Sequence, residues 1–192
     1  LASENLDLQA RTDLKVLLGQ TLDEQANWRE DDPLHRQPQW YAGRVSQALT
    51  HLLVRDQLST STRWDALLNR LQGVARLCRL GVDSIEQGNP QRTERALRTL
   101  AGTRAFYEGG LPDLLDTWPG AASGSDLRQA VDGSLDEAVT AIRALETHLE
   151  ALLPDMDDPV AIGLERYTAK LARRSSAQMT PDRLREQAGA EM

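Results

Sequence analysis

The chain has 192 residues, of which 40% are hydrophobic and 27% charged, and its formal net charge is -7. These values suit a soluble globular protein with its own core, and they disfavour binding to nucleic acid or to anionic membranes. No run of about 18 apolar residues could span a bilayer. The single cysteine, Cys78, excludes an intrachain disulfide and suits a reducing compartment, so we expect a cytoplasmic protein. The chain begins with Leu1 rather than Met, which leaves room for a removed leader.

Apolar residues recur at helical spacing along almost the whole chain, and no segment alternates as a strand does. The spacing predicts a first helix over residues 3–27, with an apolar face of Leu14, Leu17, Leu18 and Leu22. A loop rich in Asp and Pro follows. A second helix is predicted over residues 39–54, with the inward residues Val45, Leu49, Leu52 and Leu53.

Two long helices, predicted over residues 63–87 and 125–153, carry apolar seams with alternating spacings of four and three. The seam of the first consists of Trp64, Leu68, Leu71, Ala75, Cys78, Val82 and Ile85. The seam of the second consists of Val131, Leu135, Ala138, Ile142, Leu145, Leu149 and Leu152. Such heptad-like seams pack helices at shallow angles. Thr62 followed by Asp65 resembles a capping box at the start of the first of these helices.

The string from Tyr107 to Pro112 interrupts the pattern after a fourth helix, which is predicted over residues 91–107. Its two glycines and its proline cost helix stability, about 1 kcal/mol for each glycine. A kink between two packed helices and a ligand contact are both open, and the kink is favoured. Residues 111–118 continue as a short helix or a turn.

The C-terminal part begins with an acidic linker over residues 154–159, followed by a sixth predicted helix over residues 161–174. Thr180 and Pro181 are typical of the N-cap and first position of a seventh helix. No C-cap precedes Met192, so we expect this helix to be cut and the chain to be a fragment.

The predicted fold class is all-α, a bundle of about six to seven mostly antiparallel helices. We expect the bundle to comprise residues 1–160, and residues 161–192 to begin a following helical region that is truncated. Tyr167 and Leu171 are candidates for apolar groups exposed beside the last two helices.

The sequence predicts no metal site in this chain. Metal sites on helices need ligands three or four positions apart, and neither His51 nor His148 has a co-ligand at that spacing. His35 lies in a proline-flanked loop, and no His-Glu-x-x-His string occurs. We interpret the three histidines as surface or capping residues.

The remaining motifs also predict no catalytic or cofactor-binding residue. The acidic run 155–158 imitates a calcium loop, but Val160 and Arg166 stand where such a loop needs Gly and Glu. Cys78 lies on an apolar seam and is interpreted as a buried thiol rather than a nucleophile. No phosphate loop, dinucleotide fingerprint or nucleophile elbow is present.

Five arginines gather on two neighbouring predicted helices: Arg76, Arg79, Arg92, Arg95 and Arg98. Aromatic residues are not interleaved with them, as they would be in many nucleic-acid-binding surfaces. We expect these arginines to pair with the acidic helix predicted over residues 125–153 rather than with nucleic acid.

Three strings taken together resemble one family. They are Trp28 to Leu34, Arg104 to Pro112, and Ile162 to Tyr167 followed by Met179 to Leu184. Their order and spacing resemble the N-terminal half of the bacterial "domain of unknown function 885" family. The last string is the most specific, because a Gly-x-x-x-Tyr helix, a short loop and a Thr-Pro helix start follow one another.

This resemblance implies a fold similar to zinc-dependent carboxypeptidases of the thermostable type. In such proteins a helix containing His and Glu supplies zinc ligands and the general base, and a later Glu completes the site. The resemblance places that helix beyond residue 192, so no catalytic residue and no zinc ligand is carried over to this chain. It implies that this part forms one wall of a cleft for a peptide substrate.

Two hypotheses follow from the sequence. In the first, the chain is the N-terminal, non-catalytic helical portion of a zinc-metallopeptidase-like hydrolase, and its partner is the remainder of its own protein. In the second, it is a free-standing helical bundle that binds a partner helix surface through its seams. An open reading frame that stops at Met192 would exclude the first.

Overall fold

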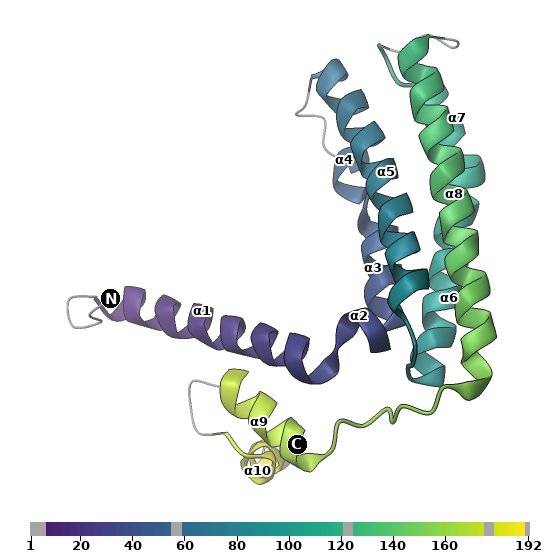
Figure 1. Ribbon diagram of the computed structural model, residues 1–192. Helices are drawn as coiled ribbons and strands as arrows, with labels where there is room; N and C mark the ends of the chain where they lie inside the picture. Colours follow the sequence, from purple (N-terminus) through teal and green to yellow (C-terminus); the bar gives the residue numbers. More distant parts are fainter. Residues whose placement is uncertain (1–6, 55–58, 121–124, 175–178, 191–192) are drawn as a thin grey trace. The chain divides into compact units, whose positions relative to one another are not determined.

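The structure is a computed structural model that describes residues 7–54, 59–120, 125–174 and 179–190. Helices make up almost all of these residues, and no strand occurs among them (Figure 1). The predicted all-α fold class is therefore confirmed.

The helices follow one another along the chain with short connections. They are α1 (Leu8–Ala26), η2 (Asn27–Asp31), α2 (Pro33–Arg36), α3 (Pro38–Gln47), α4 (Thr50–Val54), α5 (Thr60–Ser84), α6 (Pro90–Ala105), η3 (Phe106–Gly110), α7 (Leu111–Asp116), α8 (Asp126–Leu152), η4 (Leu153–Asp155), α9 (Leu164–Arg174) and α10 (Pro181–Ala190).

The chain divides into two compact units. Residues 33–158 form the central unit, and residues 1–32 together with 159–192 form the terminal unit. The sequence analysis had grouped residues 1–160 into one bundle. The difference arises because α1 contacts α9, which follows it by more than a hundred residues, and such a long-range pairing leaves no mark on local periodicity.

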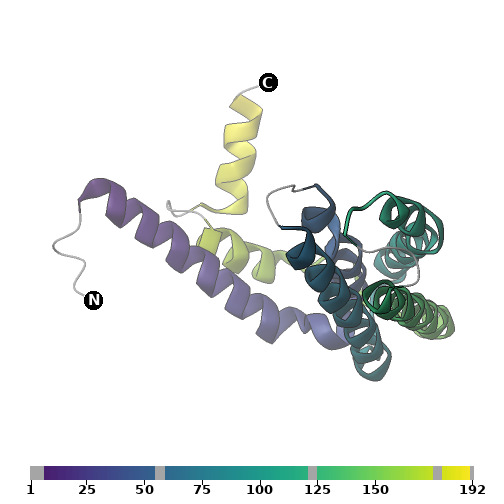
Figure 2. The ribbon, with the colours of Figure 1, turned by 90° about the horizontal axis from the view of Figure 1, so that it is seen from above.

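The core of the central unit lies between α5 and α8, which run side by side in both views (Figures 1 and 2). Their predicted seams are largely buried. The fully buried members include Trp64, Leu71, Cys78, Val131, Ile142, Leu145 and Leu149. Leu68 and Val82 are only half-buried, and Leu67 and Val74 of α5 are buried although the seam did not include them.

Side-chain caps fix where the long helices begin. The backbone N–H of Thr62 donates to Ser59 Oγ at 3.3 Å, so Ser59 is the N-cap of α5. The prediction that Thr62 and Asp65 form the capping box was wrong, because the helix begins earlier and Ser59, three residues before Thr62, is its N-cap. Asn89 caps α6 in the same way, and its Nδ2 also donates to the carbonyl of Asp158 at 2.6 Å.

The helix predicted over residues 39–54 is divided into α3 and α4. The break falls at Ala48 and Leu49. The Ala48 carbonyl at this break accepts a hydrogen bond from Arg70 Nη1 of α5 at 2.5 Å. A long-range donor thus satisfies a backbone group that the interruption exposes.

The glycine-rich interruption after α6 takes the form of the π-helix η3, which continues directly into α7. A π-turn places one more residue in each turn than an α-helix, so it shifts which side chains face the core. Tyr107 is buried by this shift, while Phe106 and Glu108 lie at the surface. Pro112, which has no N–H to donate, is the second residue of α7, the helix that directly follows the π-turn.

In the terminal unit, α1 lies beside α9. Gly19 permits this approach, because a Cβ at that position would lie 2.7 Å from the carbonyl oxygen of Arg173. Thr180 caps α10 through a hydrogen bond from the Arg183 N–H at 3.3 Å, as predicted. Tyr167 is exposed, as predicted, whereas Leu171 is half-buried.

Candidate functional site

The three histidines lie on different elements. His148 Nε2 on α8 lies 2.9 Å from the carbonyl oxygen of Ile85, at the end of α5. His51 is exposed on α4, and the His35 carbonyl accepts hydrogen bonds from the N–H groups of Glu86 and Gln87. Within the described part of the chain, no group of three or more His, Cys, Asp or Glu residues is placed to hold a metal ion.

A groove of about 480 Å³ opens in the central unit between α3 and α4 on one side and α6 and η3 on the other. Its apolar lining consists of Leu49, Leu53, Val54, Phe106 and Tyr107. Its hydroxyl-bearing lining consists of Ser46, Thr50, Thr99 and Thr103, and Gly102 and Arg98 complete it. The sequence reasoning missed this groove, because its lining comes from segments that share no motif.

Three of the hydroxyl groups that line the groove are committed to their own helices. The hydroxyl of Ser46 donates to the Gly43 carbonyl at 3.0 Å, and that of Thr103 donates to the Thr99 carbonyl at 2.9 Å. The Thr99 hydroxyl donates to the Arg95 carbonyl at 3.0 Å. These side chains therefore present mainly methyl and methylene groups to the groove.

Behind the groove, a network of four charges joins α6, η3 and α8. Arg104 Nε lies 2.8 Å from Glu146 Oε2, and Arg104 Nη1 lies 3.1 Å from Glu108 Oε2. Arg143 Nη2 reaches Glu108 Oε1 at 2.5 Å. The hydrogen bond from Arg143 is the main reason that the pKa of Glu108 lies below its ordinary value, and the charges of Arg143 and Arg104 add to the shift. The network holds η3 against α8 near neutral pH.

The core beside this network contains two buried oxygen atoms without a hydrogen-bond partner and one buried thiol. The Tyr107 hydroxyl and Glu146 Oε1 are buried and make no hydrogen bond within the described residues. Burial raises the pKa of the Cys78 thiol to about 12, and the Glu146 carboxylate adds to the rise. Burial also raises the pKa of Tyr107. A thiol held neutral in this way is a poor nucleophile, as the sequence predicted for Cys78.

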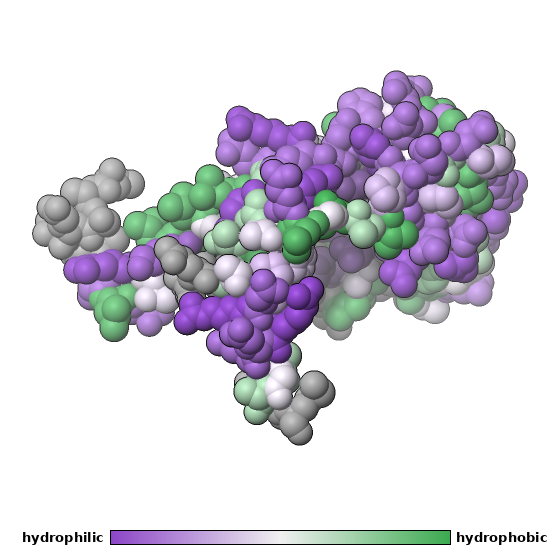
Figure 3. Space-filling view, turned by 90° about the horizontal axis from the view of Figure 1, so that it is seen from below, coloured by the Kyte–Doolittle hydropathy of each residue, from purple (hydrophilic) through white to green (hydrophobic). Residues whose placement is uncertain are grey.

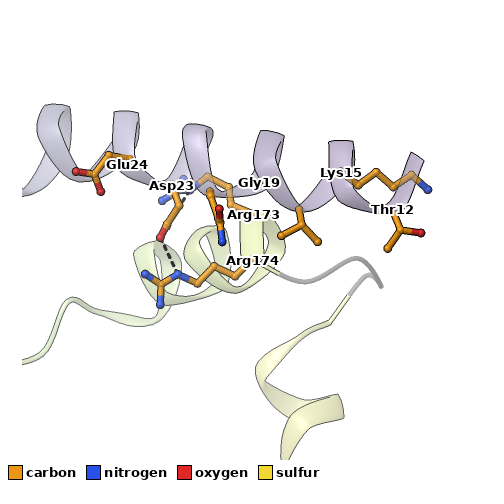
Figure 4. A pocket seen from close by; sticks show the side chains of 9 residues that line it. Thr12, Lys15, Gly19, Asp23, Glu24, Arg173 and Arg174 are labelled. Atoms are coloured by element: carbon orange, nitrogen blue, oxygen red, sulfur yellow. Dashed lines mark hydrogen bonds and ion pairs between the residues drawn. The ribbon is translucent and has the colours of Figure 1, made fainter. Parts of the chain in front are cut away.

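A larger hollow of about 980 Å³ lies in the terminal unit between α1 and α9 (Figure 4). Arg174 Nε donates to Asp23 Oδ2 at 2.6 Å across it, and Arg173 Nε lies 3.8 Å from Asp23 Oδ1. Lys15 and Thr12 lie further along α1 in the same lining. Asp23, Arg173 and Arg174 at the centre of this hollow already pair with each other. They are therefore less available to bind a ligand.

Further ion pairs join η2, which follows α1, to α9. Glu30 lies 3.7 Å from Arg166 and 3.8 Å from Arg173, while Asp31 pairs with Arg166 and lies 3.9 Å from Lys170. We call the carboxylates of Asp23, Glu30 and Asp31 with their cations on α9 the charge ladder. The ladder joins α1 and η2 to α9 by charge.

The arginines singled out in the sequence have mixed partners. Arg79 Nη2 lies 3.3 Å from Glu137 Oε2 of α8, which is the predicted pairing with the acidic helix. Arg98 instead lies 3.9 Å from Glu94 on its own helix. Among the residues that the structure describes, no helix is both long and apolar enough to cross a bilayer.

The fold defines an all-α protein whose central unit carries a partly apolar groove. The family model described as "Bacterial protein of unknown function (DUF885)" matches residues 1–192. The chain therefore belongs to this family, as its three strings predicted. No curated protein and no solved structure matches the chain.

Proposed function

We propose that this chain forms the N-terminal, non-catalytic helical portion of a zinc-metallopeptidase-like hydrolase and lines one wall of its cleft for a peptide substrate. Family membership and the three strings support this proposal. The observation that carries it is an exposed leucine face on α1. In this proposal the remainder of the same protein covers this face.

The leucine face consists of four residues of α1 with exposed fractions between 43% and 60%: Leu14, Leu17, Leu18 and Leu22. Figure 3 shows apolar residues gathered along the surface that α1 forms. Contacts with α9 run through Gly19 and Asp23 and leave these leucines uncovered. Fully covering a leucine side chain contributes about 1.5–3 kcal/mol, so a surface that covers these four leucines would stabilise the protein.

The zinc that the resemblance implies has no fitting ligand set among the described residues. Cys78, whose thiolate would be the strongest candidate ligand, is buried and kept protonated. We therefore assign no chemical step to this chain. Its proposed contribution is to shape the cleft and to support the elements that hold the metal.

An interaction module is the second candidate, since the leucine face would also fit a partner helix. The sequence predicted that the seams on α5 and α8 would provide the surface for such binding. These seams pack against each other in the core, so they offer no surface to another protein. In this alternative the leucine face is the proposed contact surface.

The test compares the double change Leu14→Ser and Leu18→Ser in residues 1–192 and in the product of the whole gene. We expect the whole protein to lose several kcal/mol of unfolding free energy, because each buried leucine contributes about 1.5–3 kcal/mol, and the shorter chain to change little. Leu80→Ser on α5 is the matched control, since Leu80 is 43% exposed like Leu14.

Two results would contradict the proposal. One is a whole protein that tolerates the double change as well as the Leu80 control. The other is a gene that ends at Met192. Binding of the leucine face to a separate protein, lost in the double variant, would favour the interaction module instead.

A further inference from the structure

The groove of the central unit has no role in the proposed function, and its lining points to a particular kind of ligand. Its volume of about 480 Å³ lies within the range of about 300–1,000 Å³ that is typical of small-molecule sites. Its walls come from four elements that pack within one unit, so its shape does not depend on how the two units are arranged.

The groove offers mainly apolar contact, and among its described lining residues the hydroxyls of Tyr107, which is buried, and Thr50 are not used by helix carbonyls. Leu49, Leu53 and Phe106 supply apolar surface, while the hydroxyl hydrogens of Ser46, Thr99 and Thr103 are used by helix carbonyls. A peptide backbone would bring carbonyl groups that need donors, and leaving such groups unpaired on burial costs about 1–3 kcal/mol each. The groove therefore suits an alkyl chain better than a peptide.

Gly102 keeps the α6 side of the groove open. It lies in the interior of α6, and a Cβ there would meet no atom of the chain within 4 Å. Alanine would stabilise the helix by about 1 kcal/mol relative to glycine. A side chain at this position would instead project into the groove and reduce the space for a ligand.

Among the residues that the structure describes, Arg98 is the cation in the lining of the groove. The Arg98 side chain is 70% exposed, and its Nη1 lies 3.9 Å from Glu94 Oε2, a separation at which an exposed pair contributes little. Arg98 can therefore turn toward an anion without losing a strong bond. Its planar guanidinium matches the two oxygens of a carboxylate.

We propose that this groove binds a small amphipathic carboxylate, with an alkyl chain along Leu49, Leu53 and Phe106 and its carboxylate paired with Arg98. The apolar walls contribute affinity in proportion to the alkyl surface that they cover. The Arg98 guanidinium orients the ligand by binding its head group, and it favours a negatively charged head group over a positively charged one. This site is independent of the leucine face of α1.

The experiment measures binding of decanoate to the 192-residue chain by calorimetry, below the concentration at which decanoate forms micelles. Gly102→Leu should weaken binding at least tenfold by filling the groove. Gly133→Leu is its matched control, because Gly133 is also an exposed glycine inside a helix whose Cβ would meet no neighbour, and it does not line the groove. This control should bind as the unchanged chain does.

Arg98→Gln tests the head group by removing the charge while keeping a polar side chain in the lining. It should weaken binding of decanoate about threefold to tenfold and leave binding of decanol unchanged, while decylammonium should bind the unchanged chain more weakly than decanol. Thermal unfolding of each variant checks that it is folded. Equal binding of decanoate by the Gly102→Leu variant, or equal affinity for decanoate and decylammonium, would overturn the proposal. Failure of the unchanged chain to bind decanoate would also overturn it.

Discussion

The central and terminal units hold their helices together by different forces. Between α5 and α8 the contact is made by fully buried side chains such as Leu71, Ile142 and Leu145. Between α1 and α9 it is made by the charge ladder, while the leucines of α1 remain exposed. Even within the ladder the fit is loose, since Asp23 Oδ1 and Arg173 Nε lie 3.8 Å apart.

This difference predicts unequal stability. Apolar burial contributes about 25 cal/mol per Å² and does not weaken with salt, whereas partly exposed ion pairs contribute about 0–1 kcal/mol and are screened. The central unit is therefore expected to be stable alone. The terminal unit is expected to open first, unless another surface covers its leucines.

The largest expected effect is in the core of the central unit. Leu145→Ala should lower the free energy of unfolding by about 2–5 kcal/mol, because it removes a fully buried side chain and leaves a cavity. Leu80→Ala, at a position 43% exposed on α5, should cost far less. Urea unfolding measures both. A loss below about 1 kcal/mol for Leu145→Ala would mean that the seam does not hold the unit together.

The next effect is a loss of stability in alkaline solution. The pKa of Cys78 rises from 9.0 to about 12 on folding, so the folded state retains a proton that the unfolded state releases. Stability should be complete below about pH 9 and fall as the pH rises toward 12, by up to about 1.4 kcal/mol per pH unit for this group. Tyr107, whose pKa is also raised, adds to the fall.

The control for this effect is Cys78→Ala, which should make the alkaline slope of unfolding free energy shallower. Slopes are compared rather than absolute stabilities, because the substitution also changes core packing. A slope unchanged by the substitution would contradict the prediction. Slow labelling of the thiol in the native chain, with fast labelling in urea, provides a second measurement.

A smaller effect is expected in the charge ladder. Asp23→Asn removes the partner of Arg174 and should speed amide hydrogen exchange in α1 and α9 about threefold to tenfold. Raising the salt to about 1 M should reproduce part of this change, because the screening length falls to about 3 Å. Exchange in α5 and α8 should not respond. Glu137→Gln, which breaks an exposed pair of the central unit, is the control.

The last prediction is that the purified chain binds no zinc. The purified chain should retain no stoichiometric zinc after dialysis, since neither His51 nor His148 has a helical co-ligand. Elemental analysis measures the content. One zinc per chain, lost when any histidine is replaced, would show that distant residues assemble a site.

Local patterns predicted most of the helices well, because the spacing of apolar residues and the caps are local properties. Thr180 and the seam residues Trp64 and Leu149 are examples. The errors arose where two local signals competed. Ser59 and Thr62 both have side chains that suit an N-cap, and in the structure Ser59 is the N-cap.

The sequence by itself determined the all-α class, the two seams and the buried state of Cys78, since each depends on the order of residues along one helix. The tertiary structure alone decided that α1 belongs with α9, because the carboxylates of the charge ladder meet their cations across more than a hundred residues. It also decided where the groove lies. A groove depends on the surfaces that separate helices leave between them, and no local pattern encodes that geometry.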